Sequence, residues 1–522
     1  MLIVSTGKNL LISQFPKYLL NNYCFLYYCS YWGGYFTSRP TLKYLERTAS
    51  SFLQVLKQST AIEPEELTKE ERKALFGLTA AVGLVNHHDA ITGTAKQHVT
   101  DDYFFLLDRA FTYAENLVSQ KMASLAAPNM DISLEMCRQT NQSRCEFSES
   151  VKVGDTFSLV AYNALPRPAS QQISLFLSED VGDASVFVSL VDDSGARTSI
   201  EAEIFATAQR NDLTVAPYTL IFTALDIPPL SFSRYIVEVG VDAKNSLSSA
   251  AGKRVVSPYS AKSEPLVVSS DKVELTFTNG LLSEVKRLDI DLSCEVSQNF
   301  YYYVGYGSPV GEHKHHKLDT RDPHLQNLQP SAAAASSESD QASGAYIFRP
   351  SKADGSDLTP VANDDVSIDV MQGSNLVEVR QRFADWASQV VRIRQGSEVV
   401  ELEWTIGPIP IDDFLGKEVI TRFESDLSSG EYVYTDANGR EFQERLKNFR
   451  PTWDLRSGSG ESEPVGGNYY PVTAAAYIRD EAKATQLTVL TDRAQGGISL
   501  FPANLYSSPM SLTLSVYFPL YF

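Results

Sequence analysis

The chain has 522 residues, of which 43% are hydrophobic and 21% are charged, a composition that excludes wholesale disorder. At about 150 residues per domain, this length predicts about three domains. The 64 acidic residues outnumber the 45 Lys and Arg residues, and the net charge of −19 provides no basic stripe for a nucleic-acid partner. An acidic chain is compatible with a neutral substrate such as a sugar. No run of about 18 apolar residues is present, so we expect no transmembrane helix and no membrane partner.

Residues 1–30 do not show the pattern of a clean signal peptide. Such a peptide has a basic start, one apolar block and a cleavage site of small residues. Here Lys8, Gln14 and Lys17 interrupt the apolar residues, and no clean site follows. The segment therefore carries no pattern that assigns it a role.

Residues 31–128 are expected to form a three-helix domain, because apolar residues recur at steps of three and four over 38–127. Ser38 is a candidate cap for the first helix, and Pro40 stands where a helix begins. Three helices with short links predict a small bundle. The side chains expected to be buried together in it are Leu42, Phe52, Leu75, Val82, Tyr103 and Leu106.

Short polar patterns mark the ends of the second and third helices. Thr68, with Glu71 three residues later, forms a capping-box pattern and predicts the start of the second helix. Gly93 is a candidate left-handed stop after that helix. Thr94 and Gln97 repeat the capping-box pattern, which predicts the start of the third helix.

From about residue 155 the sequence changes to short runs rich in β-branched and aromatic residues, separated by Pro and Gly. Strand and helix patterns do not alternate, so we expect antiparallel β-sandwich domains rather than a parallel sheet. The predicted fold class is therefore α+β. It comprises the helical domain, a first β-sandwich region at 129–300, a variable loop at 301–345 and a second, truncated β-sandwich region at 346–522.

Cys137 and Cys145 lie eight residues apart and enclose Asn141-Gln142-Ser143, the single N-x-S/T pattern in the chain. A lone pattern of this kind often arises by chance. Its position in a short Cys–Cys loop favours an oxidising, secretory compartment, and makes Asn141 a candidate glycosylation site. Because this separation closes easily, we expect Cys137 and Cys145 to form a disulfide.

The main candidate for chemistry is His87-His88-Asp89 at the predicted end of the second helix. Imidazole and carboxylate are ligand types that zinc accepts. Neighbours on a helix point about 100° apart, so we expect one histidine to bind a metal while the other supports or packs. Asp89 could bind a ligand hydroxyl or a neighbouring group. The alternative interpretation is a capped helix end with ordinary polar residues.

A second histidine cluster lies in the expected loop, where His313, His315 and His316 flank Lys314. Three imidazoles in four residues could chelate a metal. The interleaved lysine and the loop context favour a solvated tract instead.

An aromatic cluster, Tyr31-Trp32-Gly33-Gly34-Tyr35-Phe36, contains glycines that allow a close approach of the backbone. Aromatic faces stack on the C–H surfaces of sugars, and Trp32 suits that role. The alternative is a core plug at the head of the bundle, which composition alone favours. Catalytic carboxylates cannot be identified by spacing among 64 acidic residues.

Many segments, in order along the chain, resemble glycoside hydrolase family 38 α-mannosidases, specifically the lysosomal or vacuolar acid type. The resemblance covers about residues 31–500, and the Cys137/Cys145 pair around the glycosylation pattern is similar to that type as well. The segments that carry it are YWGGYFTSRP at 31–40, VNHHDAITGTAKQHVTDDY at 85–103, SDQASGAYIFRP at 339–350, ELEWTIGPIP at 401–410, GKEVITRF at 416–423, YTDANGRE at 434–441, RPTW at 450–453, and GNYYPV with LTVLTDRAQGG within 467–497.

The resemblance implies a zinc-dependent retaining exoglycosidase that removes terminal non-reducing α-D-mannose from glycoprotein glycans. Zn²⁺ would hold the hydroxyls of the terminal mannose, while one carboxylate attacks the anomeric carbon and a carboxylic acid protonates the leaving group. By match to the family's motifs, His88 would be the zinc ligand of the helical domain. Asp89 would hydrogen-bond the sugar, Trp32 would wall the pocket, and Tyr346 would reach in from the β region.

The resemblance also has a departure. In the family an N-terminal α/β barrel-like domain supplies the nucleophile, further zinc ligands and the acid. Residues 1–30 contain no His, Asp or Glu, and we recognise no family segment in residues 503–522. We therefore expect no catalytic residue in this chain and an incomplete zinc site.

Two classes of function remain open at this point. One is an α-mannosidase of the lysosome, the vacuole or the extracellular space, acting on mannose-terminated glycans. The other is a catalytically inactive remnant, or a non-catalytic carbohydrate-binding or structural protein.

Overall fold

The computed structural model describes most of the chain, in stretches separated by short and long gaps. Those stretches are residues 2–6, 24–25, 28–29, 31–61, 66–126, 134–138, 143–181, 184–209, 211, 215–240, 256–259, 265–307, 342–352, 355–362, 366–430, 432–450, 464–500 and 510–516. Asn141 and the histidines at 313–316 lie outside the described residues.

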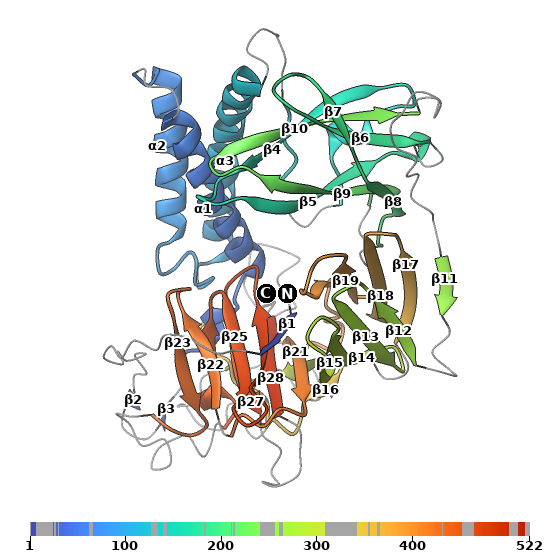
Figure 1. Ribbon diagram of the computed structural model, residues 1–522. Coiled ribbons are helices and arrows are strands. Elements are labelled where there is room, and N and C mark those ends of the chain that lie inside the picture. Colours follow the sequence, from blue (N-terminus) through green and yellow to red (C-terminus); the bar gives the residue numbers. More distant parts are fainter. Residues whose placement is uncertain are drawn as a thin grey trace.

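Three helices form the bundle at one side of the molecule: α1 (Pro40–Ala61), α2 (Lys69–Val85) and α3 (Gln97–Ala126) (Figure 1). This confirms the expected three-helix domain, with Pro40 as the first residue of α1. At Ser38 the side-chain Oγ donates to the carbonyl of Gly93.

The predicted capping box at the start of α2 is formed. Thr68 Oγ1 accepts a hydrogen bond from the amide of Glu71 at 3.1 Å, and the Glu71 carboxylate accepts from the amide of Thr68 at 2.6 Å. The same carboxylate pairs with Lys121 of α3 at 2.6 Å. The hydrogen bond from Lys121, aided by those from Thr68, lowers the pKa of Glu71 to about 2. One acidic residue therefore both caps α2 and joins it to α3.

The bundle core differs from the expected set by one helical position. Leu107, not Leu106, is fully buried in the core of α3, and Leu53 is more deeply buried than its neighbour Phe52. Phe52 packs at the edge of the core and stacks on Phe111. The 3.6-residue period explains the shift, since the buried positions of α3 follow one face of the helix. Those positions include Thr100, Leu107, Ala110, Phe111, Ala114 and Val118.

The second predicted capping box is not formed, and α3 begins at Gln97 itself. Thr94 Oγ1 donates to Asp89, while the Gln97 side chain accepts from Arg39 and donates to Asp101. Both side chains are therefore engaged by groups that the capping pattern does not include.

A short helix, α4 (Glu146–Glu149), leads into a first β-sandwich, drawn in the upper part of Figure 1. One sheet has the order β4-β10-β6-β7, and the other has the order β5-β9-β8. All pairings are antiparallel, and the sheets enclose a core that includes Leu220 and Val237. The strands are β4 (Thr156–Asn163), β5 (Ala169–Leu177), β6 (Val186–Val191), β7 (Arg197–Ile200), β8 (Ala202–Ala206), β9 (Tyr218–Ile227) and β10 (Ser231–Val239), with a 3-10 turn, η2, at Glu179–Val181.

The second β region contains three further antiparallel sheets. Their orders are β11-β17-β18-β19-β20; β12-β13-β14-β15-β21-β28-β27-β24, with β16 beside β15; and β1-β26-β25-β22-β23. The elements are β1 (Leu2–Thr6), β11 (Val256–Tyr259), β12 (Leu266–Ser269), β13 (Val273–Thr278), β14 (Leu281–Arg287), β15 (Leu292–Val304), β16 (Thr359–Pro360), β17 (Ser367–Gln372), β18 (Leu376–Ala384), β19 (Ala387–Arg394), β20 (Glu401–Ile406), β21 (Lys417–Ser425), β22 (Tyr432–Ala437), β23 (Glu441–Leu446), η4 (Gly466–Asn468), β24 (Tyr470–Val472), β25 (Ala475–Asp480), β26 (Thr485–Leu490), β27 (Gln495–Leu500) and β28 (Met510–Val516).

The sheet topology moves the division between the two β regions. The expected division at residue 300 falls inside β15, and β12 to β15 share a sheet with β21. The first region therefore ends with β10, and β11 to β15 belong to the second region. Residues 1–30, which had no expected structure, contribute β1 at the edge of a sheet beside β26, and a short hairpin of β2 (Cys24–Phe25) and β3 (Tyr28–Cys29).

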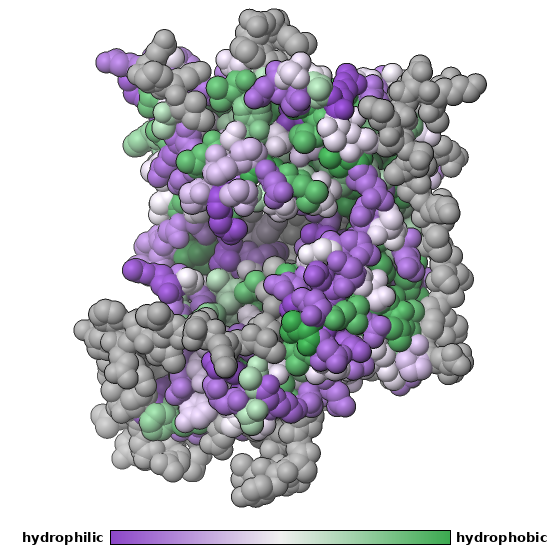
Figure 2. Space-filling model, in the orientation of Figure 1, coloured by the Kyte–Doolittle hydropathy of each residue, from purple (hydrophilic) through white to green (hydrophobic). Residues whose placement is uncertain are grey.

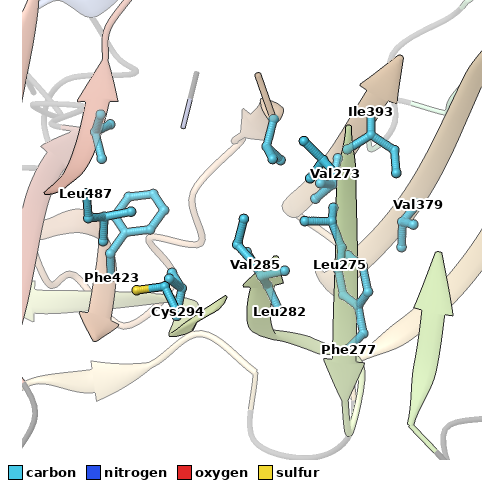
Figure 3. Packing of buried hydrophobic residues seen from close by; sticks show 14 of the residues in the cluster. Val273, Leu275, Phe277, Leu282, Val285, Cys294, Val379, Ile393, Phe423 and Leu487 are labelled. Atoms are coloured by element: carbon cyan, nitrogen blue, oxygen red, sulfur yellow. The ribbon is translucent and has the colours of Figure 1, made fainter. Parts of the chain in front are cut away.

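The largest apolar core joins the three sheets of the second β region (Figure 3). Val273, Leu275 and Phe277 project from β13, while Val379 and Ile393 approach from the neighbouring sheet. Burial of each such side chain contributes about 1.5–3 kcal/mol, so this core fixes the sheets against one another. The expected α+β class with antiparallel β-sandwich domains is confirmed. Among the described helices, none is both long and apolar enough to cross a bilayer.

Candidate functional site

His87, His88 and Asp89 lie in the turn that follows the last residue of α2, Val85. The Nε2 atoms of His87 and His88 lie 3.4 and 3.7 Å from the same Asp89 oxygen, Oδ2. Helix geometry predicts that the two imidazoles point apart, as neighbours on a helix do. They converge instead because the helix has already ended, and the turn brings both rings to one side.

The donor set fits part of a zinc site. One ligand atom from each of the three residues lies within 4.8 Å of the other two. Ligands at bond lengths of about 2.1 Å around a tetrahedral ion lie about 3.4 Å apart, so small movements of these exposed side chains would suffice. Catalytic zinc sites use three protein ligands plus a water or substrate, and structural sites use four. The turn therefore offers a suitable but open set.

The turn is held against the start of α1 by backbone contacts. Gly93 has a φ of 73°, and a Cβ atom there would lie 2.6 Å from the backbone oxygen of Ser38, so glycine alone fits. The buried ammonium of Lys43 donates to the carbonyls of Ser38 and Ile91, at 2.7 and 2.6 Å. Burial, followed by the charge of Arg39, lowers the pKa of Lys43 to about 7. The second helix was expected to end near Gly93, but α2 ends earlier, at Val85, and Gly93 docks the turn that follows.

Trp32 and Tyr346, from segments more than 300 residues apart, form an exposed aromatic pair. Their ring centroids lie 5.4 Å apart in an edge-on arrangement, and the residues are 45% and 39% exposed. The amide of Gly34 donates to the carbonyl of Tyr346 at 3.2 Å. A Cβ atom on Gly34 would lie 2.3 Å from the carbonyl oxygen of Gly344, so the two backbones are in close contact.

Beneath this pair lies an aromatic floor made of Phe36, Phe348 and Tyr469. The Tyr469 ring lies 4.7 Å from that of Phe348 and 5.6 Å from that of Phe36, measured between centroids. It also fits between two glycines, since added Cβ atoms on Gly33 and Gly496 would lie 2.7 and 2.1 Å from its ring atoms. Three distant segments therefore fix the backbone that carries Trp32.

The structure brings the expected site residues together in two pairs. Trp32 contacts Tyr346, and His88 lies beside Asp89. Ser38 links the pairs, because it follows the Trp32 segment directly and bonds to Gly93 of the histidine turn. Within the described parts of the chain, no hydrogen bond or ring contact joins the pairs directly.

Two features of the site were not foreseen from the sequence. His87 joins His88 at the same carboxylate oxygen, and Lys43 is buried although lysine side chains are usually exposed. The signal for Lys43 is its place beside the apolar stripe of α1, but a lysine there is usually solvated. Only the carbonyl groups that surround its ammonium explain the burial.

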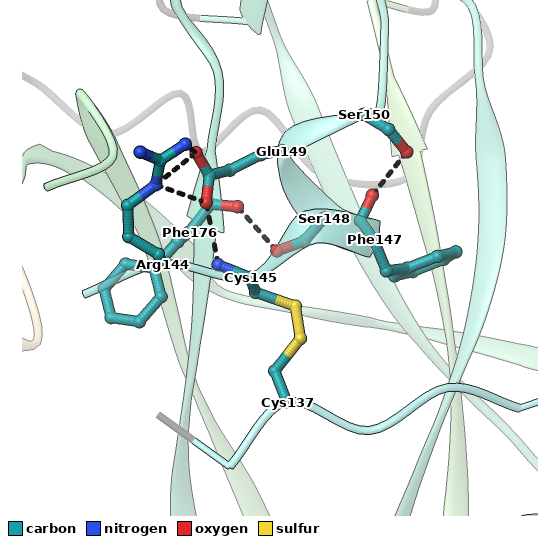
Figure 4. The surroundings of a disulfide bond; sticks show 8 residues. All are labelled: Cys137, Arg144, Cys145, Phe147, Ser148, Glu149, Ser150 and Phe176. Atoms are coloured by element: carbon teal, nitrogen blue, oxygen red, sulfur yellow. Dashed lines mark hydrogen bonds and ion pairs between the residues drawn. A yellow bond between two sulfur atoms is a disulfide. The ribbon is translucent and has the colours of Figure 1, made fainter. Parts of the chain in front are cut away.

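Cys137 and Cys145 form a disulfide beside the first β-sandwich (Figure 4). The amide of Cys145 donates to Glu149, and Ser148 of the same short helix donates to the carbonyl of Phe176 in β5. On the other side, Arg138 binds Glu115 of α3 through two hydrogen bonds. The disulfide loop therefore ties the helical bundle to the first β-sandwich.

A separate cavity of about 510 Å³ lies between β5, β8 and β9 of the first sandwich and the sheet that contains β18 and β19. Figure 2 shows a hollow near the middle of this face, rimmed largely by hydrophilic residues. Arg380, Arg392, Glu378 and Glu403 line it and are bound to one another. The cavity walls therefore carry charges of both signs, and these charged side chains are paired with one another.

Comparison with known proteins gives two domain matches. Residues 30–125 match the alpha mannosidase middle domain, and residues 272–516 match the glycosyl hydrolases family 38 C-terminal domain. The second match extends to residue 516, so the expectation that residues 503–522 have no counterpart in the family is wrong for residues 503–516.

Curated relatives extend the likeness over nearly the whole chain. The lysosomal alpha-mannosidases of Homo sapiens and Cavia porcellus are 35% and 34% identical over 492 and 483 residues, which is 91% of this chain and 42% of each relative. An alpha-mannosidase of Arabidopsis thaliana is 31% identical over 487 residues, covering 90% of this chain and 43% of the relative. The chain spans less than half the length of the curated relatives it matches.

Solved structures from Enterococcus faecalis are also similar. A glycosyl hydrolase family 38 protein has a TM-score of 0.49 at 11% identity, covering 92% of this chain and 56% of its own. An alpha-mannosidase has a TM-score of 0.49 at 10% identity, covering 94% of this chain and 52% of its own.

Proposed function

We propose that this chain provides the mannose-binding side of an α-mannosidase site. The chain belongs to glycosyl hydrolase family 38 and carries that family's middle and C-terminal domains. The substrate is terminal, non-reducing α-D-mannose in glycoprotein glycans. The observation that carries the proposal is the exposed Trp32–Tyr346 pair, whose segment is linked to the histidine turn by the hydrogen bond from Ser38 to Gly93.

Each residue of the site has a proposed role. Trp32 and Tyr346 present ring surfaces to the apolar face of the sugar. His88 binds zinc, and Asp89 accepts hydrogen bonds from sugar hydroxyls. Zinc, when bound, would orient and polarise the hydroxyls of the terminal mannose. His87 supports the turn through the oxygen that it shares with His88.

Hydrolysis needs more than this side of the site. A retaining glycosidase uses two carboxyl groups about 5–5.5 Å apart, one as nucleophile and one as acid and base. Among the described residues of the histidine turn and the aromatic pair, Asp89 is the single carboxylate. We therefore expect these 522 residues alone to bind mannose weakly and to turn over α-mannosides negligibly. The remaining chemistry would come from sequence like the half of the relatives that this chain does not span.

The first experiment measures binding. Purified protein is titrated by calorimetry with methyl α-mannoside, with and without zinc, and methyl α-glucoside serves as the sugar control. We expect mannose-specific binding that weakens at least tenfold in Trp32→Ala, and a zinc dependence that disappears in His88→Ala. His98→Ala is the matched control, because His98 is an exposed histidine near the start of α3. Equal binding of both sugars would contradict the proposal.

The second experiment separates the enzyme from the alternative, a non-catalytic carbohydrate-binding or structural protein. An aryl α-mannoside is assayed at acidic pH with added zinc, with metal analysis of the same sample. Turnover that disappears in His88→Ala would show that a catalytic carboxylate lies within this chain. Mannose binding without turnover, even after this chain is combined with a protein that carries the part of the relatives it does not span, would favour the alternative.

The likeness to lysosomal enzymes also bears on location. We place the protein in an acidic, oxidising compartment, a lysosome or vacuole, which agrees with the disulfide at Cys137 and Cys145. Labelling intact cells with a tagged protein and an acidic-compartment dye tests this location, and a diffuse signal would contradict it.

A further inference from the structure

Glu418 of β21 is a buried carboxyl group, and no cation of the described residues forms an ion pair with it. The residue is 3% exposed, and the Tyr469 hydroxyl donates to its Oε1 atom at 3.2 Å. Its second oxygen, Oε2, has no hydrogen-bond partner among the described residues. A buried carboxylate in this state would leave its charge almost uncompensated, which is costly in a protein interior.

The groups that face Glu418 do not supply the missing charge. Tyr303 stands directly opposite it in the β15–β21 register, and the Tyr303 hydroxyl also lacks a partner within the described region. Arg422 lies four residues along β21 and pairs with Glu424. Asp357, which accepts a hydrogen bond from Ser351, adds a negative charge near Tyr303.

The nearest lysine in sequence, Lys417, is engaged elsewhere. Its ammonium binds both carboxylate oxygens of Asp413 and the carbonyl of Pro410. Burial raises the pKa of Glu418 well above its usual range, and the hydrogen bond from Tyr469 offsets only part of this. The neighbouring Tyr303 is affected in the same way, since burial raises its pKa as well. A proton on Glu418 is therefore the simplest means of neutralising the site.

The position of Glu418 connects it to the aromatic pair. Tyr469, its hydrogen-bond partner, is the floor residue that fits between Gly33 and Gly496. Gly33 follows Trp32 directly, and Tyr469 contacts Phe348, two residues after Tyr346. A change at Glu418 thus reaches both members of the pair through one tyrosine ring.

We propose that Glu418 is a positioning residue that stands as a neutral carboxylic acid under the aromatic floor, so that its ionisation above acidic pH loosens the Trp32–Tyr346 pair. The ligand of that pair rests on the proposed function, whereas the response to pH does not. The site would then be well ordered in an acidic compartment and poorly ordered outside it.

The sign of the effect follows from proton linkage. A carboxyl group whose pKa is raised by folding holds its proton in the folded state after the unfolded chain has lost it. Its contribution to stability is complete below the unfolded pKa, near 4.3, and is lost as pH rises toward the folded value. Over that interval the unfolding constant should increase about tenfold per pH unit on account of this group.

The test compares the pH dependence of the full chain and Glu418→Gln, which keeps a neutral group of similar shape. Urea unfolding is followed by tryptophan fluorescence from pH 4.5 to 8. We expect wild type to lose stability relative to Glu418→Gln by about tenfold in the unfolding constant per pH unit above 4.5. Equal slopes for the two proteins would overturn the proposal.

A native-state readout separates positioning from simple stability. Trp32 emission, isolated as the difference between the chain and its Trp32→Phe variant, should change with pH in the folded protein and stay constant in Glu418→Gln. A pH-independent Trp32 signal in the wild type would overturn the positioning role.

Two further variants provide a substitute in case Glu418→Gln does not fold and a control for burial. If Glu418→Gln does not fold, Tyr469→Phe removes the hydroxyl donor to Glu418, and the loss of stability should then extend to higher pH. Glu378→Gln is the matched control, because Glu378 is equally buried but bound to arginines. This substitution should leave the loss of stability at rising pH unchanged. A pH response without mannose binding would contradict the proposed function alone, and binding without a pH response would contradict this inference alone.

Discussion

Two glutamates in neighbouring sheets are equally buried and yet have opposite electrostatic surroundings. Glu378 of β18 and Glu418 of β21 are each 3% exposed. Arg380 donates to Oε2 of Glu378 from Nε and Nη2, and Arg392 donates to Oε1 at 2.7 Å. Among the described residues, Glu418 accepts one hydrogen bond, from the hydroxyl of Tyr469.

Burial alone therefore does not decide the charge of a carboxyl group. It acts to raise the pKa of Glu378 too, but the attraction of Arg392 and Arg380 outweighs it, and the pKa lies below its usual range. Without such partners the pKa of Glu418 is raised. In this fold the surroundings of Glu378 favour the ionised carboxylate, and those of Glu418 favour the neutral acid.

The largest change in stability is expected when Glu378, the ionised glutamate of the two, is neutralised. Glu378→Gln should lower the free energy of unfolding by about 3–5 kcal/mol at pH 7, because two largely buried guanidinium groups lose their shared partner. Urea unfolding measures the loss. The effect should shrink as pH falls, because a carboxylate with a lowered pKa contributes stability above its unfolded pKa and loses it in acid. A variant as stable as the wild type would mean that water already compensates these charges.

A third carboxylate sharpens the comparison in the helical bundle. Glu71 caps α2 and pairs with Lys121, and its pKa is lowered to about 2. Glu71→Gln should cost about 2 kcal/mol at pH 7, since it removes a charge-assisted bond and part of the capping box. In wild type this contribution should fade between about pH 4.5 and 2, the reverse of the Glu418 response. Thermal unfolding across that range, with Glu70→Gln as the exposed control, checks the sign.

Loss of the hydrogen bond from Tyr469 to Glu418, the neutral glutamate of the two, should lower the free energy of unfolding by a smaller amount. Tyr469→Phe keeps the ring between its glycines and removes the hydroxyl that reaches Glu418. We expect a loss of about 1 kcal/mol at pH 5 by urea unfolding, which is typical of one hydrogen bond between uncharged groups. A loss as large as that of Glu378→Gln would indicate that Glu418 is ionised in the folded state.

The smallest effect is expected for an exposed ion pair at the turn between β18 and β19 of the Glu378 sheet. Arg382 binds Asp385 at 2.9 Å, but the Asp385 side chain is 96% exposed. Asp385→Asn should leave the unfolding midpoint unchanged within error, because solvent screens such a pair. A clear shift would show that proximity to the cavity, rather than burial, sets the strength of ion pairs here.

Local sequence patterns predicted the helices well, because periodicity and caps act over a few residues. The stripe of α1 and the capping box at Thr68 both formed. The pattern at Thr94 failed because α3 begins only at Gln97, and the Thr94 hydroxyl instead donates to the nearby Asp89. Leu106 and Leu107 are adjacent leucines, so periodicity alone could not decide which one faces the core.

Longer-range features needed the resemblance or the structure itself. The family resemblance, not spacing, singled out Trp32 and Tyr346 as members of one site, and the structure places their rings in contact. Nothing in the sequence of β21 marks Glu418 as buried, because the usual alternation is absent where both faces of a strand are covered. The division between β regions was missed for a similar reason, since strand pairing across residue 300 leaves no local signal.

The aromatic floor also constrains the order in which the protein can fold. Gly33 and Gly496, which enclose Tyr469, stand at opposite ends of the chain. During synthesis the helices and the first β-sandwich can form early, since their contacts are mostly local, whereas contacts between such distant segments carry the largest loop-closure cost. The backbone under Trp32 must therefore wait until β27 has left the ribosome. Until then an otherwise folded chain exposes apolar rings, and this interval is when it would most need a chaperone.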